Sequence, residues 1–403
     1  KIYNALNQSP SATTIAIFID LKKAFDTVDH DILLKKMEHY GIRNRANDWF
    51  KSYLSEREQF VTINGTNSEN ITVKCGVPQG SVLGPLLFLL FINDLPNATD
   101  ILTLLFADDT TFQVSGCDIP KLFEYANLEL QKASNWFKAN KLTLNVKKTK
   151  FMLFSGQKNV IDLDNLNLQI DGKYVDQIGN NCKDKYFKFV GHVLDENLTW
   201  EGHLEHIAKK LASANFAINS SKNFLPIHIR KTIYYSLFDS HLNFGNILWG
   251  CASNKILKRI ETLQKKCIRN VSLKKFNAHS EPIFKELEIL KISDKIAYCQ
   301  AIFMHQYRHK KLPVSFENMF QEITENDALQ TRHNDYNFIN KPAIKRYLEK
   351  FPTKTMLSNW NYLDIECKAT ADAEEFKSLL KQKFLSSYSS EPECDANCYI
   401  CND

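Results

Sequence analysis

The chain has 403 residues, a formal net charge of +5 and 44% hydrophobic residues, a content that excludes a globally disordered protein. Its longest apolar run, Val82 to Ile92, is about half as long as a membrane-spanning helix needs to be, so we expect no membrane partner. Ten cysteines spread over this length indicate reduced thiols rather than a secreted disulfide framework, and no signal peptide opens the sequence. We therefore expect an intracellular protein, in the nucleus, the cytoplasm or both.

The charge is concentrated in the middle of the chain. Residues 1–200 have a net charge of −1, residues 201–320 of +10 and residues 321–403 of −4. A basic segment of this kind predicts a surface that binds a polyanion, with nucleic acid as the obvious partner. A solvated helical face is the alternative that charge alone leaves open.

The first predicted elements are a strand and a helix. Thr14 to Asp20 alternates isoleucines with other residues, which predicts a strand. A helix follows, with Asp29 or Asp31 as its N-cap. Short strand-like pieces then lie around residues 59–64 and 70–75, and polar turn residues separate them.

The next segment predicts a helix and a hairpin. From Val82 to Leu95 the chain is apolar on all sides, which predicts a helix that is buried all round. Residues 102–106 and 110–114 then flank a short polar segment, Ala107 to Asp109, and this arrangement predicts a β-hairpin.

The remaining pattern changes from mixed to helical. A helix is expected from about residue 118, and strands are expected at 150–154 and 187–193. Up to about residue 200 the order of elements therefore predicts an α+β fold, a sheet backed by helices. Beyond it, apolar residues recur at helical spacing, namely at Leu204, Ile207, Leu211, Ala214 and Ile218 and again at Ile256, Ile260, Leu263, Cys267 and Val271.

Three aspartates are the first candidates for chemistry. Asp20 ends a predicted buried strand, and Asp108 and Asp109 lie at the tip of the predicted hairpin. If these strands are neighbours, the carboxylates converge, and hard divalent cations such as Mg²⁺ or Mn²⁺ offset their repulsion. Two such ions about 4 Å apart serve phosphoryl transfer. An Asp-Asp pair in a turn is also ordinary turn chemistry, and that alternative stays open.

A loop rich in glycine and proline is the second candidate. It runs from Gly76 to Pro85 and leads directly into the predicted apolar helix. Gly80 lets a backbone or a base approach closely, and helix N-terminal amides can face a phosphate. A plain turn in front of a core helix is the alternative.

These segments together resemble the motifs of a known family. Phe18 to Asp26, Gly76 to Gly80 and Phe106 to Asp109 look like motifs A, B and C of reverse transcriptases. Leu142 to Lys150 and Phe187 to Gly191 resemble motifs D and E in the expected order. The surrounding sequence is similar to the polymerases of non-LTR, LINE-type retrotransposons, at residues 49–54, 57–61 and 91–95. Ala107 also matches the non-LTR form, since retroviral enzymes have Tyr at that position.

The resemblance implies a role for each matching residue of motifs A and C. Asp20 and Asp108 would hold two catalytic Mg²⁺ ions, with the Leu21 carbonyl as a further ligand and Asp109 as a third carboxylate. Phe25 would be the steric gate, an aromatic ring against C2′ of the sugar that excludes a 2′-hydroxyl by bulk. A core aromatic is the alternative for Phe25.

The other motifs imply contacts with nucleotide and primer. Gln79 and Gly80 would line the incoming nucleotide and its template base. Lys148 would protonate the pyrophosphate leaving group or offset its charge, although Lys147 and Lys150 are close in sequence. Phe189, Val190 and Gly191 resemble the primer grip.

The helical middle third would be the thumb of the polymerase. Its basic residues fit the backbone of a template–primer duplex, with salt-sensitive binding as the consequence. Three cysteines near the C-terminus are spaced like part of a zinc site, but a tetrahedral site needs a fourth ligand, so zinc stays open. The predicted nucleic-acid contacts are Lys209, Lys210, Lys258, Arg259, Lys265, Lys266 and Arg269, and the cysteines are Cys394, Cys398 and Cys401.

The resemblance thus implies an α+β reverse-transcriptase palm, an antiparallel sheet backed by helices, at residues 1–195. A helical thumb at 196–320 and a C-terminal region at 321–403 would follow. The expected activity is RNA-directed DNA polymerisation on an RNA template, from dNTPs and a DNA primer. Nineteen residues precede Asp20, so we expect most of the fingers to be missing. The alternatives are a catalytically idle, nucleic-acid-binding remnant of a retroelement and another palm-type nucleotidyltransferase, such as a cyclase.

Overall fold

The computed structural model describes residues 2–9, 12–155, 166–323, 336–342 and 350–390. Contacts divide the chain into two compact units, one of residues 1–191 with 195–197, the other of residues 192–194 with 198–403. No helix in the described ranges is long and apolar enough to cross a membrane.

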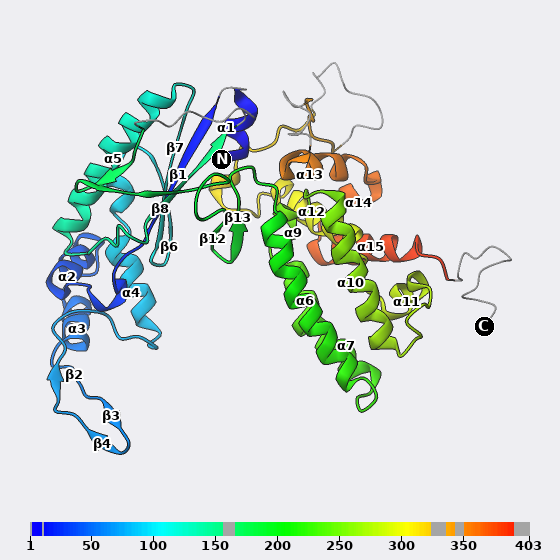
Figure 1. The fold of residues 1–403 in the computed structure, drawn as a ribbon, viewed down its shortest axis with the longest axis horizontal. Coiled ribbons are helices and arrows are strands. Elements are labelled where there is room, and N and C mark those ends of the chain that lie inside the picture. The colour runs from blue at the N-terminus through cyan, green and yellow to red at the C-terminus, as the bar shows by residue number, and fades with distance from the viewer. Residues whose placement is uncertain (1, 10–11, 156–165, 324–335, 343–349, 391–403) are drawn as a thin grey trace. The chain divides into compact units, whose positions relative to one another are not determined.

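A five-stranded sheet organises the first unit, and β1, β6, β7 and β8 of this sheet are labelled in Figure 1. Its strand order is β11-β8-β1-β7-β6. Its central strand, β1 (Thr13–Ile19), pairs antiparallel with β7 (Asp109–Gly116) and β8 (Lys150–Ser155), and all its residues are buried. β6 (Leu102–Phe106) adds an antiparallel edge, and β11 (Asp176–Ile178) pairs parallel with β8. The sheet confirms the predicted α+β fold.

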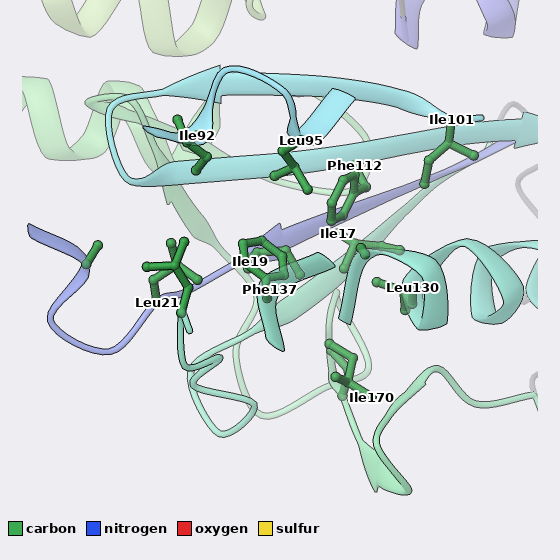
Figure 2. Close-up of a cluster of buried hydrophobic side chains, with 14 of the residues drawn as sticks. Ile17, Ile19, Leu21, Ile92, Leu95, Ile101, Phe112, Leu130, Phe137 and Ile170 are labelled. Atoms are coloured by element: carbon green, nitrogen blue, oxygen red, sulfur yellow. The ribbon is translucent and has the colours of Figure 1, made fainter. Parts of the chain in front are cut away.

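The helices cover one face of this sheet through a shared apolar core. Ile17 and Ile19 of β1 pack in one cluster with Phe112 of β7 and with Leu130 and Phe137 of the long helix α5 (Ile119–Ala139) (Figure 2). α5 begins where its N-cap, Asp118, accepts a hydrogen bond from the backbone N–H of Lys121. α2 (His30–His39) begins in the same way at Asp29, one of the two N-caps that the sequence predicts.

The apolar helix after the glycine-rich loop is buried on one side only. α4 (Leu83–Ile92) buries Leu87, Phe88, Phe91 and Ile92 in the core. Leu86 and Leu89 remain 48% and 45% exposed, so the prediction of burial all round is wrong. The reason is geometric, because a single layer of helices on a sheet covers only the helix face that looks toward the sheet.

A second correction concerns the strand expected at 187–193. A turn divides it, since Val190 and Gly191 both have positive φ angles, 42° and 81°.

The smaller elements of the first unit are α1 (Ile2–Gln8), η1 (Ala24–Asp26), α3 (Arg45–Leu54), β2 (Glu58–Gln59), β3 (Thr62–Ile63), β4 (Thr66–Asn67), β5 (Ile71–Thr72), η2 (Leu95–Ala98), β9 (Gln169–Ile170), β10 (Lys173–Tyr174) and β12 (Phe187–Phe189).

The second unit is mainly helical and has two hydrophobic clusters. The first joins α6 (Glu201–Ser221) to α10 (Asn254–Ser272), and the apolar residues predicted at helical spacing lie in it. The second surrounds Trp360. The other elements are β13 (His192–Leu194), α7 (Ile227–Ile233), the π-helical η3 (Tyr234–Asp239), α8 (Ser240–Asn243), α9 (Asn246–Trp249), α11 (Ser280–Leu287), α12 (Ile292–Arg308), η4 (Val314–Phe316), α13 (Pro352–Asn361), α14 (Ile365–Ala369) and α15 (Ala373–Ser386).

Candidate active site

The three aspartates lie at one end of the sheet. Ile19 of β1 pairs with Thr110 of β7, and Asp20 and Asp109 are the next positions beyond that pair. Asp108 belongs to the turn between β6 and β7. Because central β1 pairs with β7, the strand register places Asp20 at the same end of the sheet as Asp109, which is 89 residues away in sequence.

The hairpin turn is tight and strained. Phe106 pairs with Asp109, so only Ala107 and Asp108 connect the two strands. Ala107 has a φ of 52°, in the left-handed region, which a two-residue hairpin requires and which a side chain disfavours. Asp108 and Asp109 are both exposed, whereas Asp20 is half-buried.

Electrostatic repulsion couples the three carboxylates. The pKa of Asp109 is raised, first by partial burial and then by the negative charges of Asp108 and Asp20. Charges that disfavour one another in this way attract a cation. This shift is consistent with the prediction from the sequence that the three carboxylates repel one another.

The donor chemistry of this end of the sheet fits a hard divalent cation, because Asp20, Asp108 and Asp109 offer only oxygen ligands. Partial burial and then repulsion raise the pKa of Asp109, and such an ion would relieve the repulsion. Among the described residues, no three His, Cys, Asp or Glu side chains lie close enough together to form a metal site as they stand.

Asp20 is held by a segment that lies far away in sequence. Asn145 donates its side-chain amide to the Asp20 carboxylate, Nδ2 to Oδ2, at 2.8 Å, and its backbone N–H to the Asp20 carbonyl, also at 2.8 Å. The Asp20 N–H in turn donates to the Thr149 hydroxyl at 3.2 Å. Sequence reasoning did not assign Asn145 and Thr149 a role, because nothing local reveals a partner more than 120 residues away.

The backbone around Leu21 is also held by this distant segment. Leu21 forms an isolated antiparallel bridge with Leu144, in which the neighbouring residues make the hydrogen bonds, from Lys22 N–H to the Thr143 carbonyl and from Asn145 N–H to the Asp20 carbonyl. The bridge therefore fastens the backbone on both sides of Leu21. The role of the Leu21 carbonyl as a metal ligand stays a prediction.

The glycine-rich loop packs directly on the segment that follows Asp20. Gly76 has a φ of 90°, and a Cβ there would lie 2.8 Å from the backbone oxygen of Asp26. The next residue, Val77, donates its N–H to the Phe25 carbonyl at 2.8 Å. His30 Nε2 lies 2.7 Å from the Gly76 carbonyl. Only glycine allows the loop to approach so closely.

The loop also brings Gln79 to Asp26, the residue after Phe25. Gln79 donates its amide, Nε2, to Oδ1 of Asp26 at 2.7 Å, and both side chains are exposed. Phe25 is half-buried, with its ring 4.6 Å from that of Phe88. Gly80 has a φ of 81° and open space around its Cβ position. Asp26 is a site residue that sequence reasoning missed.

The three lysines near motif D differ in their surroundings. Lys150 donates to Oδ2 of Asp176 at 2.6 Å, so an ion pair holds it on the sheet. Lys147 and Lys148 are exposed. The assignment of the leaving-group role to Lys148 stays a prediction.

Of the residues predicted as the primer grip, Phe189 lies against β1, together with its neighbour Phe187. Phe187 stacks on Phe18 with 4.0 Å between ring centroids, and Phe189 lies 5.6 Å from the same ring. Phe18 is on the face of β1 opposite to Ile17 and Ile19, so these rings cover the face of the sheet that the helices leave open. Val190 and Gly191 form the turn described above.

The predicted nucleic-acid contacts lie on α6 and α10 of the second unit. Lys265 pairs with Glu261 at 2.6 Å, and Arg269 donates Nε to the Ala278 carbonyl at 2.7 Å. The cysteines predicted as a partial zinc site, Cys394, Cys398 and Cys401, lie outside the described residues. The remaining basic residues, Lys209, Lys210, Lys258, Arg259 and Lys266, are exposed.

The first unit thus has a mostly antiparallel sheet with helices on one face, carboxylates at adjacent strand ends and a glycine-rich loop nearby. This is the palm arrangement that the sequence resemblance implies. The model of the reverse transcriptase (RNA-dependent DNA polymerase) family matches residues 3–194.

Similar proteins include two from Drosophila melanogaster. The RNA-directed DNA polymerase from mobile element jockey is 28% identical over 298 residues, which cover 70% of this chain and 31% of that protein. The probable RNA-directed DNA polymerase from transposon BS is 26% identical over 300 residues, with the same coverage, 70% and 31%. A telomerase from Candida albicans, solved with a TWJ fragment of telomeric RNA, overlaps 79% of this chain and 52% of that chain at a TM-score of 0.40 and 11% identity.

Proposed function

We propose that this chain is part of the RNA-directed DNA polymerase of a non-LTR retrotransposon. It would transfer a nucleotidyl group from a dNTP to the 3′-hydroxyl of a DNA primer on an RNA template. The observation that carries the proposal is the register of β1 and β7, which places Asp20 beside the Asp108–Asp109 turn.

Asp20, Asp108 and Asp109, with the Leu21 carbonyl, would hold Mg²⁺ or Mn²⁺. Divalent ions bound there supply the charge that stabilises the attacking and leaving oxygens of a phosphoryl transfer. Asn145 keeps the Asp20 carboxylate oriented, because it bonds both the side chain and the backbone of that residue.

The residues around the carboxylates would select and orient the nucleotide. The Phe25 ring would exclude a 2′-hydroxyl by bulk, and its contact with Phe88 supports it from behind. Gln79 and Gly80 would line the nucleotide and template base, Lys148 would donate a proton to the pyrophosphate, and Phe189, Val190 and Gly191 would hold the primer end. The exposed lysines of α6 and α10 would follow the phosphate backbone.

The test is primer extension on an RNA template by Asp108→Asn, beside a gel-shift titration with the same template–primer. The substitution keeps the shape of the side chain but removes its charge, so extension should be lost while binding stays within about two-fold of wild type. Asp48→Asn, on the exposed face of α3, is the matched control and should extend normally. Extension by Asp108→Asn at the wild-type rate would refute the site.

A wild-type chain that binds template–primer but never extends it would support the other proposal, an idle nucleic-acid-binding remnant. Because the chain spans 31% of the length of each of the two relatives, extension should also be measured after adding an upstream segment. A rescue by that segment would locate the missing contacts in the fingers, which orient the triphosphate.

A further inference from the structure

Two phenylalanine side chains in loops of the second unit are largely exposed to solvent. Phe224, between α6 and α7, is 86% exposed, and Phe276, between α10 and α11, is 85% exposed. An isolated exposed apolar residue is ordinary, but two aromatic rings at two adjoining loops make a surface that fits a flat, apolar partner.

Hydrogen bonds bring the two loops to the same end of the unit. The side chain of Asn270, near the end of α10, donates to Asn215 of α6 at 2.9 Å and accepts from Lys222 Nζ at 3.2 Å. Its carbonyl accepts from Arg230 of α7 at 3.3 Å. Figure 1 shows the α6–α7 connection and the segment between α10 and α11 at this end.

This end of the unit carries basic residues and no acidic ones in two long segments. Residues 206–238 and 262–280 contain no Asp or Glu, and each contains five Lys or Arg. Arg230 is buried against Asn270, and Lys265 is paired with Glu261 at the border of the region. Lys274 and Lys275 are exposed immediately before Phe276. The other border carboxylate, Glu281, pairs with Lys291.

We propose that this surface, the phenylalanine tip (Phe224, Lys274, Lys275 and Phe276), binds single-stranded RNA. Unpaired bases would stack on the two rings, while the lysines would neutralise the phosphates between them. Duplex nucleic acid does not fit, because its bases already stack on one another and their faces are closed to the rings. The choice of RNA over DNA rests on the proposed function, in which RNA is the template.

The tip differs from the predicted thumb contacts in what it recognises. Lysines alone bind any polyanion, with an affinity that falls steeply with salt. Stacking adds a contribution that does not depend on salt and that requires unpaired bases. The two contributions can therefore be separated by experiment.

The experiment is a fluorescence-anisotropy titration of the full chain with a labelled single-stranded RNA, without nucleotides or divalent ions. The same RNA annealed to its complement is the second probe. Phe224→Ala and Phe276→Ala should each weaken single-strand binding about 5- to 100-fold, leave duplex binding unchanged and leave the log–log salt slope unchanged. The Lys274→Ala/Lys275→Ala double variant should instead flatten that slope by about 1.4.

Tyr362→Ala is the matched control, because Tyr362 is also in the second unit and is 91% exposed, but it stands near Asp364 and Glu366. It should bind both probes as the wild type does. Far-UV circular dichroism verifies that the loop variants keep their helices.

Equal loss of single-strand and duplex binding in the phenylalanine variants, or no loss of either, would overturn the proposal. Tighter Phe-dependent binding to single-stranded DNA than to RNA would overturn the assignment to RNA. Phe-dependent binding to vesicles of phosphatidylserine and phosphatidylcholine, without Phe-dependent RNA binding, would make the tip a membrane contact instead. Asp108→Asn should bind the RNA normally, so a failure of polymerisation and a failure of the tip give different results.

Discussion

Phe25 is positioned by residues from two other segments of the chain. Val77 N–H bonds its carbonyl, and the Phe88 ring lies 4.6 Å from its own ring. The first contact fixes the backbone of Phe25 and the second supports its ring, so a ring that acts as the proposed gate would have little freedom to move away from a larger sugar.

Phe25→Val should therefore admit ribonucleotides. The expected result is a fall of the dNTP over rNTP ratio of kcat/KM by about 10-fold or more, since the discrimination is steric. Single-nucleotide incorporation kinetics with each nucleotide measure the ratio. A ratio that stays at the wild-type value would make Phe25 a core residue rather than a gate.

Asp26 is expected to orient Gln79. The carboxylate accepts the Gln79 amide at 2.7 Å, which turns the carbonyl oxygen of that amide away from Asp26. Asp26→Ala should lower kcat/KM for dNTPs about 3- to 10-fold, the net value of one ordinary hydrogen bond, because both side chains are exposed.

Asp26→Asn, whose oxygen can still accept from Gln79, should recover part of this loss, and Asp48→Ala should have no effect. The measurement is steady-state primer extension over a range of dNTP concentrations. If Asp26→Ala and Asp26→Asn behave alike and like wild type, the contact with Gln79 has no role in nucleotide binding.

At the scale of elements, α6 contains a buried histidine that makes the second unit sensitive to acid. His203 is 2% exposed, and its Nδ1 accepts the Val193 N–H at 3.3 Å. Burial first, and then the charges of His192, His206 and Lys210, lower the pKa of His203 to about 4. The neutral ring is thus the form that the fold accommodates.

The stability of this unit should fall as the pH drops from 6.5 to about 4, because the unfolded chain then binds a proton at His203 that the folded chain does not. Above pH 6.5 the ring is neutral in both states and contributes no pH dependence. The expected loss is on the order of 2 kcal/mol after allowance for partial solvation.

Urea unfolding of the wild type and of His203→Gln at both ends of this pH range measures the effect. The variant should be less sensitive to acid, whereas exposed His228→Gln should behave as the wild type does. Identical pH profiles for all three proteins would assign the acid sensitivity to other groups.

At the scale of the whole molecule, the hydrophobic cores of the two units are separate. Phe112 lies fully buried in the cluster of the first unit, and Trp249 lies fully buried in a cluster of the second. Units with separate cores can unfold in separate transitions.

Calorimetry should therefore show two transitions that respond to different substitutions. Phe112→Ala should lower one and Trp249→Ala the other, each by about 3–5 kcal/mol in the free energy of unfolding, the cost of a large cavity. Phe60→Ala, at a side chain that is 53% exposed, is the control and should shift neither. One transition that both core variants lower equally would show that the units unfold together.

The local sequence predicted those elements whose pattern matches their environment. β1 has the predicted alternation and pairs with a strand on each side. α5 buries its predicted apolar stripe, because a helix of 21 residues with a regular apolar face can remove that face from water only by packing it against the core. The order of motifs also predicted the family whose model matches residues 3–194. Motifs are identified by residue type and order alone, so this prediction needed no tertiary structure.

Tertiary structure decided which residues meet. The exposed side of α4 depends on where the layer of helices ends, and a sequence that is apolar all round does not contain that information. The bonds from Asn145 to Asp20 and from Gln79 to Asp26 join segments 125 and 53 residues apart, so no local pattern predicts them. The sequence by itself determined which carboxylates are candidates for chemistry, whereas the pairing of β1 with β7 decided that they lie at one end of the sheet.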